Sequence, residues 1–189
     1  MTQVPTLEGY GCRLRPVTVE DAGFIVNLRN QPYAAGTIHA TSQSVEAQES
    51  WIKAWMLREH DYYWIIESLE DSGKPIGAIG LYDFTIDQTE AMPGRWVMLP
   101  RVPMVVFAPV FLMYKFAFEE LKLKRLVLDV IDTNKKVIKF HALYGARMIS
   151  CPKRYESETA PAGRSFVWFE IERDQWPKIF REWDEVLQT

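Results

Sequence analysis

Apolar residues change their spacing twice between positions 117 and 148, and this stretch carries the clearest structural signal in the chain. Helical spacing around Phe118 and Leu121 gives way to strict alternation at positions 126, 128 and 130, and helical spacing returns from Val137 onward. Asn134 stands where the second helix would begin, and Gly145 stands where it would end. The stretch therefore predicts a helix, a buried strand and a second helix, in that order.

The other apolar patterns extend this order toward both ends of the chain. Strands are expected over residues 12–17, 62–68, 75–84, 95–99, 148–155 and 165–172. The turn sequence Asp-Ser-Gly-Lys at 71–74 joins the second and third of these as a hairpin. Helices are expected over 18–30, over 45–58 and after Asp174, which is placed to cap the last one. The predicted order is βααβββαβαββα, which is an α/β fold.

Length and composition narrow the class of protein. With 189 residues and a formal net charge of -3, we expect one domain over 1–189 and no binding of free nucleic acid, because no long basic run is present. Cys12 and Cys151 lie far apart without metal-ligand spacing, so we expect free thiols, no metal and a reducing cytoplasm. No targeting or membrane segment is expected, since the most apolar run is too short to span a bilayer. The oligomeric state stays open, with a homodimer among the options.

The segment from 117 to 148 resembles the acetyl-CoA-binding half of the GNAT superfamily of N-acetyltransferases. In that family an Asn follows such a strand, the next helix carries a Tyr, and a Gly-aromatic pair follows; this chain has Asn134, His141, Gly145 and Ala146 at those places. The resemblance covers roughly residues 12–172 and implies a GNAT fold with a mixed central sheet between helices. It also implies acetyl-CoA as the acyl donor and direct transfer to an amine in a ternary complex.

The resemblance implies a pyrophosphate cradle before the helix that precedes the strand. The family's RGxGxG-type loop falls here on Arg101, Val102, Pro103, Met104, Val105 and Val106. The Arg is kept and the glycines are lost, so the anion would be held by the start of the helix and by the charge of Arg101. Pro103 suits a first helical position, but Pro109 would kink a helix begun there, and the helix could begin at Pro109 instead. The alternative interpretation is that this stretch is simply the apolar start of a helix packed on the sheet.

The pantetheine arm of the cofactor is expected along the strand at 95–99. Val97, Met98 and Leu99 of this strand are therefore expected to bind the cofactor. Asn134, which follows the next strand, is expected to bind it too.

His141 takes the position of the family's Tyr, so the resemblance implies that it protonates the thiolate of CoA. A neutral or a charged imidazole could do this, and the charged form, with an ordinary pKa of about 6.5, is a stronger acid than a phenol near neutrality, though less fully protonated. The alternatives are a structural histidine, or Tyr144 as the donor one helical turn on. Asp83 and Glu90, at the end of one strand and the approach to the next, are the candidate bases.

The sequence carries fewer signals for the acceptor amine than for the acyl donor. His39, Tyr82 and Arg95 are the candidate contacts for it. The glycine-poor VPMVV loop is similar to the loop of transferases that acetylate nucleotide-linked amino sugars, so this acceptor class comes first. Alternatives are a protein N-terminus, an aminoglycoside-type amine, or a GNAT domain that binds without turnover.

Overall fold

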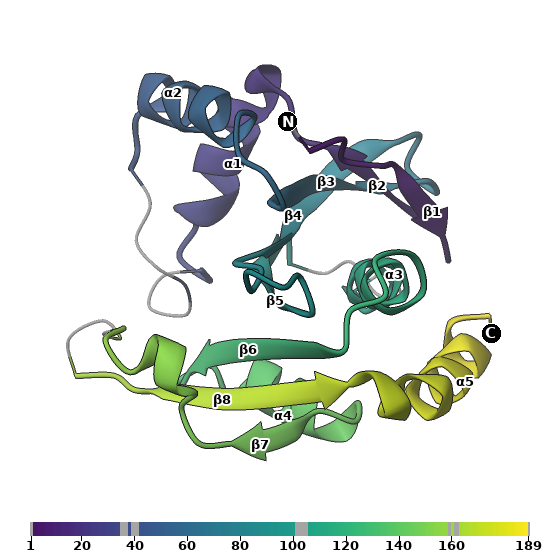
Figure 1. Ribbon diagram of the computed structural model, residues 1–189. Helices are drawn as coiled ribbons and strands as arrows, with labels where there is room; N and C mark the ends of the chain where they lie inside the picture. Colours follow the sequence, from purple (N-terminus) through teal and green to yellow (C-terminus); the bar gives the residue numbers. More distant parts are fainter. Residues whose placement is uncertain are drawn as a thin grey trace.

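One mixed sheet of eight strands forms the frame of the protein, with strand order β1-β2-β3-β4-β5-β6-β8-β7 (Figure 1). The computed structural model describes residues 2–34, 38, 42–100, 106–158, 160 and 163–188. The strands are β1 (Leu7–Gly9), β2 (Cys12–Pro16), β3 (Tyr62–Ser68), β4 (Lys74–Tyr82), β5 (Glu90–Met98), β6 (Arg125–Ile131), β7 (Arg147–Ile149) and β8 (Phe166–Glu172). The pair β5–β6 is parallel and every other neighbouring pair is antiparallel.

Helices cover both faces of this sheet. They are α1 (Ala22–Arg29), α2 (Val45–Trp55), α3 (Ala108–Lys115), α4 (Lys135–Leu143) and α5 (Trp176–Leu187), and a π-helical turn, Phe116–Glu120, continues α3. Alternation along β3 sets the two layers: Tyr63 and Ile65 join the core under α1 and α2, and Trp64 and Ile66 join the larger core around α3. Helices α1 and α2 lie together at one end of the molecule, and α3 lies between the strands and α5 (Figure 1).

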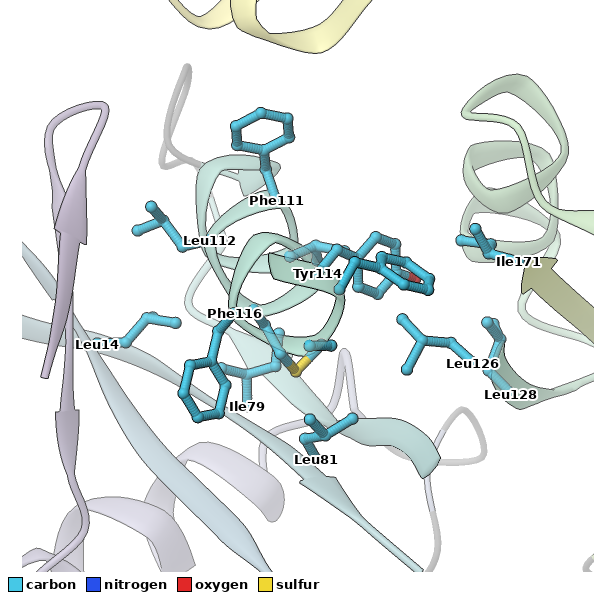
Figure 2. Close-up of a cluster of buried hydrophobic side chains, with 14 of the residues drawn as sticks. Leu14, Ile79, Leu81, Phe111, Leu112, Tyr114, Phe116, Leu126, Leu128 and Ile171 are labelled. Carbon is cyan, nitrogen blue, oxygen red and sulfur yellow. The ribbon is translucent and has the colours of Figure 1, made fainter. Parts of the chain in front are cut away.

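The core around α3 joins the two halves of the sheet. Leu14, Ile79 and Leu81 approach α3 from one side, and Leu126, Leu128 and Ile171 face it from the other (Figure 2). Burying apolar side chains from both halves against one helix is the main stabilising contribution at this point. Helix α3 therefore holds the two halves at a fixed separation.

The sheet opens between β5 and β6. These strands pair at Glu90–Arg125 and Ala91–Leu126, and within the described parts of both strands the pairing goes no further. Strand β6 continues instead against β8 over its whole length, from Arg125 to Ile131. The backbone groups of β5 beyond Ala91 therefore face an opening on that side.

Most of the elements expected from the sequence are confirmed. Asn134 caps α4 by accepting a hydrogen bond from the backbone N–H of Val137 at 3.3 Å, and Gly145 ends it with φ +89°. The hairpin turn lies at Ser72 and Gly73, both with positive φ. The α/β class with a mixed central sheet between helices is also confirmed.

Several boundaries were wrong. Strand β1 was missed because only its pairing with β2, through a tight turn at Tyr10 and Gly11, makes three residues a strand. Strand β7 is shorter than the expected 148–155, because its pairing with β8 stops at Ile149. Helix α5 begins at Trp176 after a 3₁₀ turn, so Asp174 is not its cap. Helix α3 begins at Ala108, which agrees with the alternative start at Pro109, and this proline falls in the first turn, where the missing N–H costs nothing.

Candidate active site

A cavity occupies the opening between β5 and β6, and we call it the split cavity. Four elements line it: residues 93–96 of β5, Val110, Met113 and Tyr114 of α3, residues 128–131 of β6, and Val137 and His141 of α4. Asn134, Tyr82 and Arg29 complete the polar part of the wall. The predicted residues Asn134, His141, Tyr82 and Arg95 are thus brought to one place by segments that are far apart in the sequence.

A β-bulge shapes the β5 wall of the split cavity. Ala78 and Gly80 of β4 stand opposite Val97 and Gly94 of β5, so β5 has one extra residue there, and Arg95 has φ +53°. Gly94 has no side chain at the place where a Cβ would lie 2.5 Å from the hydroxyl of Tyr82. The bulge and this glycine together let the β5 backbone and Tyr82 share the cavity wall.

Two partners fix the guanidinium of Arg95. Its Nη1 and Nη2 donate to the two carboxylate oxygens of Asp61 at 2.5 and 3.0 Å, and Asp61 is 7% exposed. The same guanidinium lies 4.0 Å from the ring centroid of Tyr82. A bidentate carboxylate and an aromatic face restrict its orientation, as planar recognition requires.

His141 is buried in the wall of the split cavity, 7% exposed, with its ring beside Phe140 and Phe169. Burial lowers the pKa of His141 to about 4. At neutral pH the resting ring is therefore neutral, with an N–H on one of its nitrogens and the other able to accept a proton. Tyr144 does not line the cavity, because its ring packs 3.7 Å from that of Trp183.

Two buried donors in the same wall have no acceptor among the described residues. They are the hydroxyl of Tyr114 and the indole Nε1 of Trp96. Burial also raises the pKa of Tyr114, which keeps its proton in place. A buried donor without a partner is costly, and these two donors belong to residues that line the cavity. The thioester and the two amide carbonyls of an acyl-pantetheine arm, between apolar walls, fit this arrangement.

A second cavity adjoins the first one at Arg95, and we call it the acidic cavity. Tyr82, Arg95 and Asp129 line both cavities. The acidic cavity adds Asp61, Asp83 and Glu158 to Asp129, against the two cations Arg58 and Arg95. Asp61 is paired with Arg58 and Arg95, and Asp83 with Arg154, so Asp129 and Glu158 are the carboxylates placed to meet a positively charged amine.

Asp129 was missed in the sequence. It is partly exposed and lies in β6 between the buried residues Leu128 and Val130. Its signal was present: an acidic residue in the middle of the apolar strand Arg125–Ile131 is unusual unless a cavity or a partner receives it.

The two predicted bases occupy different surroundings. Asp83 lines the acidic cavity and accepts from Nη2 of Arg154 at 2.7 Å. Glu90 is the first residue of β5, where its carboxylate pairs with Arg125 at 3.0 Å, and it lines neither cavity. Strand β5 starts earlier than expected, and the sheet is still closed at Glu90.

The residues predicted to bind the cofactor also lie in different surroundings. Val97 and Leu99 belong to the core under α1 and α2, and Met98 packs on the core around α3, so residues 93–96 replace them as the β5 wall. Val106 lies just before α3. Five further predicted residues lie outside the described residues: His39, Arg101, Val102, Met104 and Val105.

Two absences concern only the described part of the chain. No group of three or more His, Cys, Asp or Glu side chains is gathered there as a metal site requires. None of the helices described is long and apolar enough to cross a membrane.

Comparisons with known proteins agree with this geometry. Residues 12–147 match the family model for an acetyltransferase (GNAT) domain. No curated protein matches the chain. Among solved structures, apo FdhC, a nucleotide-linked sugar GNAT, is similar with a TM-score of 0.80 and 25% identity, over 98% of this chain and 99% of that one.

Two other similar structures show the fold alone. A GCN5-related N-acetyltransferase from Brucella melitensis has a TM-score of 0.80 and 15% identity over 98% of this chain and 86% of its own. A mutant of the spermidine N-acetyltransferase SpeG from Vibrio cholerae has a TM-score of 0.70 and 16% identity over 89% of this chain and 97% of its own. The family match spans well over half of the chain and falls on the strands and helices that form the split cavity, so this protein belongs to the GNAT family and is an N-acetyltransferase.

Proposed function

We propose that this enzyme transfers the acetyl group of acetyl-CoA to the amine of a nucleotide-linked amino sugar. The observation that carries the proposal is the junction at Tyr82, Arg95 and Asp129, where an apolar cavity with unpaired donors meets a cavity rich in carboxylates. The first suits an acyl-pantetheine arm and the second an ammonium group. The similarity to a nucleotide-linked sugar GNAT over nearly the whole chain supports the acceptor class.

The residues of the split cavity hold and polarise the donor. Acetyl-CoA supplies the acyl group as a thioester. Tyr114 and Trp96 donate hydrogen bonds to carbonyl oxygens of the acyl-pantetheine arm, and Asn134 and residues 93–96 line its path. The pyrophosphate is assigned to the segment 101–106, with Arg101 as its cation, and this assignment stays a prediction.

Two groups handle protons at the junction. Asp129 accepts the proton that the ammonium must lose before its nitrogen attacks the thioester carbon. The carbon–nitrogen bond forms, and the nitrogen passes its second proton to the unprotonated ring nitrogen of neutral His141. The bond between carbon and sulfur breaks, and the imidazolium returns a proton to the sulfur. Negative charge developing on the sulfur stabilises this transient imidazolium and offsets part of the cost of its burial. Asp83 and Glu90 stay alternatives to Asp129 as the base.

A panel of acceptors tests the proposal. Release of free CoA is measured with a nucleotide-linked amino sugar, an N-terminal peptide, an aminoglycoside and acetyl-CoA alone. We expect the amino sugar to give the highest kcat/KM. Faster turnover of a peptide or an aminoglycoside than of every amino sugar tried would reject the acceptor class and leave the transferase intact.

A polycationic acceptor is the second candidate, because the acidic cavity carries four carboxylates against three arginines, counting Arg154, which pairs with Asp83. An aminoglycoside with several ammonium groups would be attracted by this imbalance. The panel separates the two candidates, since the aminoglycoside would then give a higher kcat/KM than every nucleotide-linked amino sugar tried.

We place the reaction in the cytoplasm. Cys12 and Cys151 are both free thiols, with Cys12 buried and Cys151 exposed, and free thiols persist in a reducing compartment.

A further inference from the structure

A third cavity lies under α1 and α2, and its charge is opposite to that of the acidic cavity. Its wall includes Arg29, Gln48, Trp51, Tyr63 and Arg95, and none of the described lining residues is a carboxylate. We call it the basic cavity. Arg29 also lines the split cavity, and Arg95 lines all three cavities, so the basic cavity is continuous with the site described above.

The two arginines lie close enough to oppose each other's charge. Burial lowers the pKa of Arg29, and the nearby charge of Arg95 lowers it further. An anion between the two guanidinium groups would remove this repulsion, and its charge would compensate for the hydration that the arginines lose on burial.

Arg95 has donors to spare for such an anion. A guanidinium carries five N–H donors, and the bonds to Asp61 use two of them. Asp61 and the Trp51 ring, 5.3 Å from the guanidinium carbon, hold the group in place. Gln48 is 8% exposed and adds an amide to the same wall.

The charges of the two outer cavities differ in a way that matches a bipolar substrate. The acidic cavity offers carboxylates to an ammonium group, and the basic cavity offers guanidinium groups to an anion. They meet at Arg95, where both adjoin the split cavity. A substrate with an amine at one end and a diphosphate at the other would meet opposite charge at both ends.

We propose that the basic cavity binds the diphosphate of the acceptor between Arg29 and Arg95, with the amide of Gln48 as a further hydrogen-bond donor. This inference rests on the proposed function, which supplies the nucleotide-linked amine. It adds the site, its residues and the group that each residue recognises.

Isothermal titration with thymidine diphosphate and uridine diphosphate tests the site. Titrations are run with CoA at saturation, so that the nucleotides do not occupy the pyrophosphate site of CoA. We expect saturable binding of the diphosphates, no binding of thymidine, and an affinity that falls as salt is raised. Arg29→Gln should weaken diphosphate binding by roughly tenfold or more, the scale of one charge-assisted hydrogen bond.

Controls keep the test decisive. Arg181→Gln removes the same charge from the exposed face of α5 and should change nothing. Gln48→Met keeps the side-chain length and should weaken binding less than Arg29→Gln, which covers the case in which the arginine variant does not fold. Equal affinity of wild type and both cavity variants, or binding of thymidine as tight as that of the diphosphate, would overturn the inference.

The test also separates this inference from the proposed function. If a nucleotide-linked amino sugar is acetylated with the same KM by wild type and Arg29→Gln, the basic cavity is not the diphosphate site, although the function stands. If the diphosphates bind through Arg29 and no amino sugar is turned over, the site stands and the acceptor assignment fails.

Discussion

At the scale of the residue, the environment of His141 changes what its side chain can do. The ring is 7% exposed, and burial lowers its pKa to about 4. The unfolded chain has an ordinary histidine with a pKa of about 6.5, so between these two values the unfolded state binds more protons than the folded state. Stability contributed by neutral His141 is present above pH 6.5 and is lost as the pH falls toward 4.

We therefore expect the free energy of unfolding to be about 2 kcal/mol lower at pH 5 than at pH 7 from this group alone. Urea denaturation of the wild type and of His141→Gln at both pH values measures it. All other titrating groups are shared, so the difference between the two pH dependences isolates His141. Parallel pH dependences of the two proteins would show that His141 is not a buried neutral group.

Asp129 gives the second prediction at this scale. Its carboxylate borders both the split cavity and the acidic cavity, where the amine proton must be removed. Asp129→Asn keeps the shape and removes the base, so kcat should fall by about a hundredfold, and the affinity for acetyl-CoA should stay the same. Steady-state kinetics and a CoA titration measure the two effects.

Three matched variants complete the Asp129 experiment. Glu182→Gln removes an exposed carboxylate from α5 and serves as the control. Asp83→Asn and Glu90→Gln remove the two bases expected from the sequence. A large loss of kcat in one of these, with Asp129→Asn active, would move the role of base to that residue.

At the scale of the element, the way in which α4 ends fixes the position of this helix, which carries His141. Gly145 has φ +89°, and a Cβ there would lie 2.7 Å from Cγ1 of Ile179 in α5. Gly145→Ala should destabilise the protein by about 1–3 kcal/mol through left-handed strain and this clash. Gly23→Ala in α1, where a Cβ meets nothing within 4 Å, should be neutral or stabilising by about 0.5–1 kcal/mol. Denaturation midpoints of the two variants measure the contrast, and equal midpoints would contradict it.

At the scale of the whole molecule, the split cavity is bounded by both halves of the sheet. A ligand seated there contacts β5 on one side and β6 on the other. Acetyl-CoA at about 100 times its Kd should add about 2.7 kcal/mol to the stability, which is a rise of roughly 5–10 °C in Tm for a chain of this size.

Hydrogen exchange locates the same effect. Acetyl-CoA should slow exchange in peptides that cover β5 and in peptides that cover β6, because ligand contacts suppress local opening on both sides. A rise in Tm with protection confined to α1 and α2 would place the cofactor outside the split cavity.

The sequence by itself determined the local elements of this protein. The hairpin at Ser72 and Gly73, the cap at Asn134 and the stop at Gly145 followed from residues that act on their own backbone or on near neighbours. The apolar run of β3 and the alternation of β6 were equally readable, because burial in a sheet leaves a pattern along a single segment. The order of these elements predicted an α/β fold, and the resemblance of residues 117–148 implied the GNAT family.

Only the tertiary structure decided the site. The extra residue that bulges β5 at Arg95 is defined by its register against β4, and the opening of the sheet is defined by where β5 and β6 stop pairing. The lowered pKa of His141 and the meeting of Asp129 with Arg95 depend on segments that are distant in the chain. Register, burial and cavity walls are properties of pairs of segments, so no pattern along one segment could reveal them.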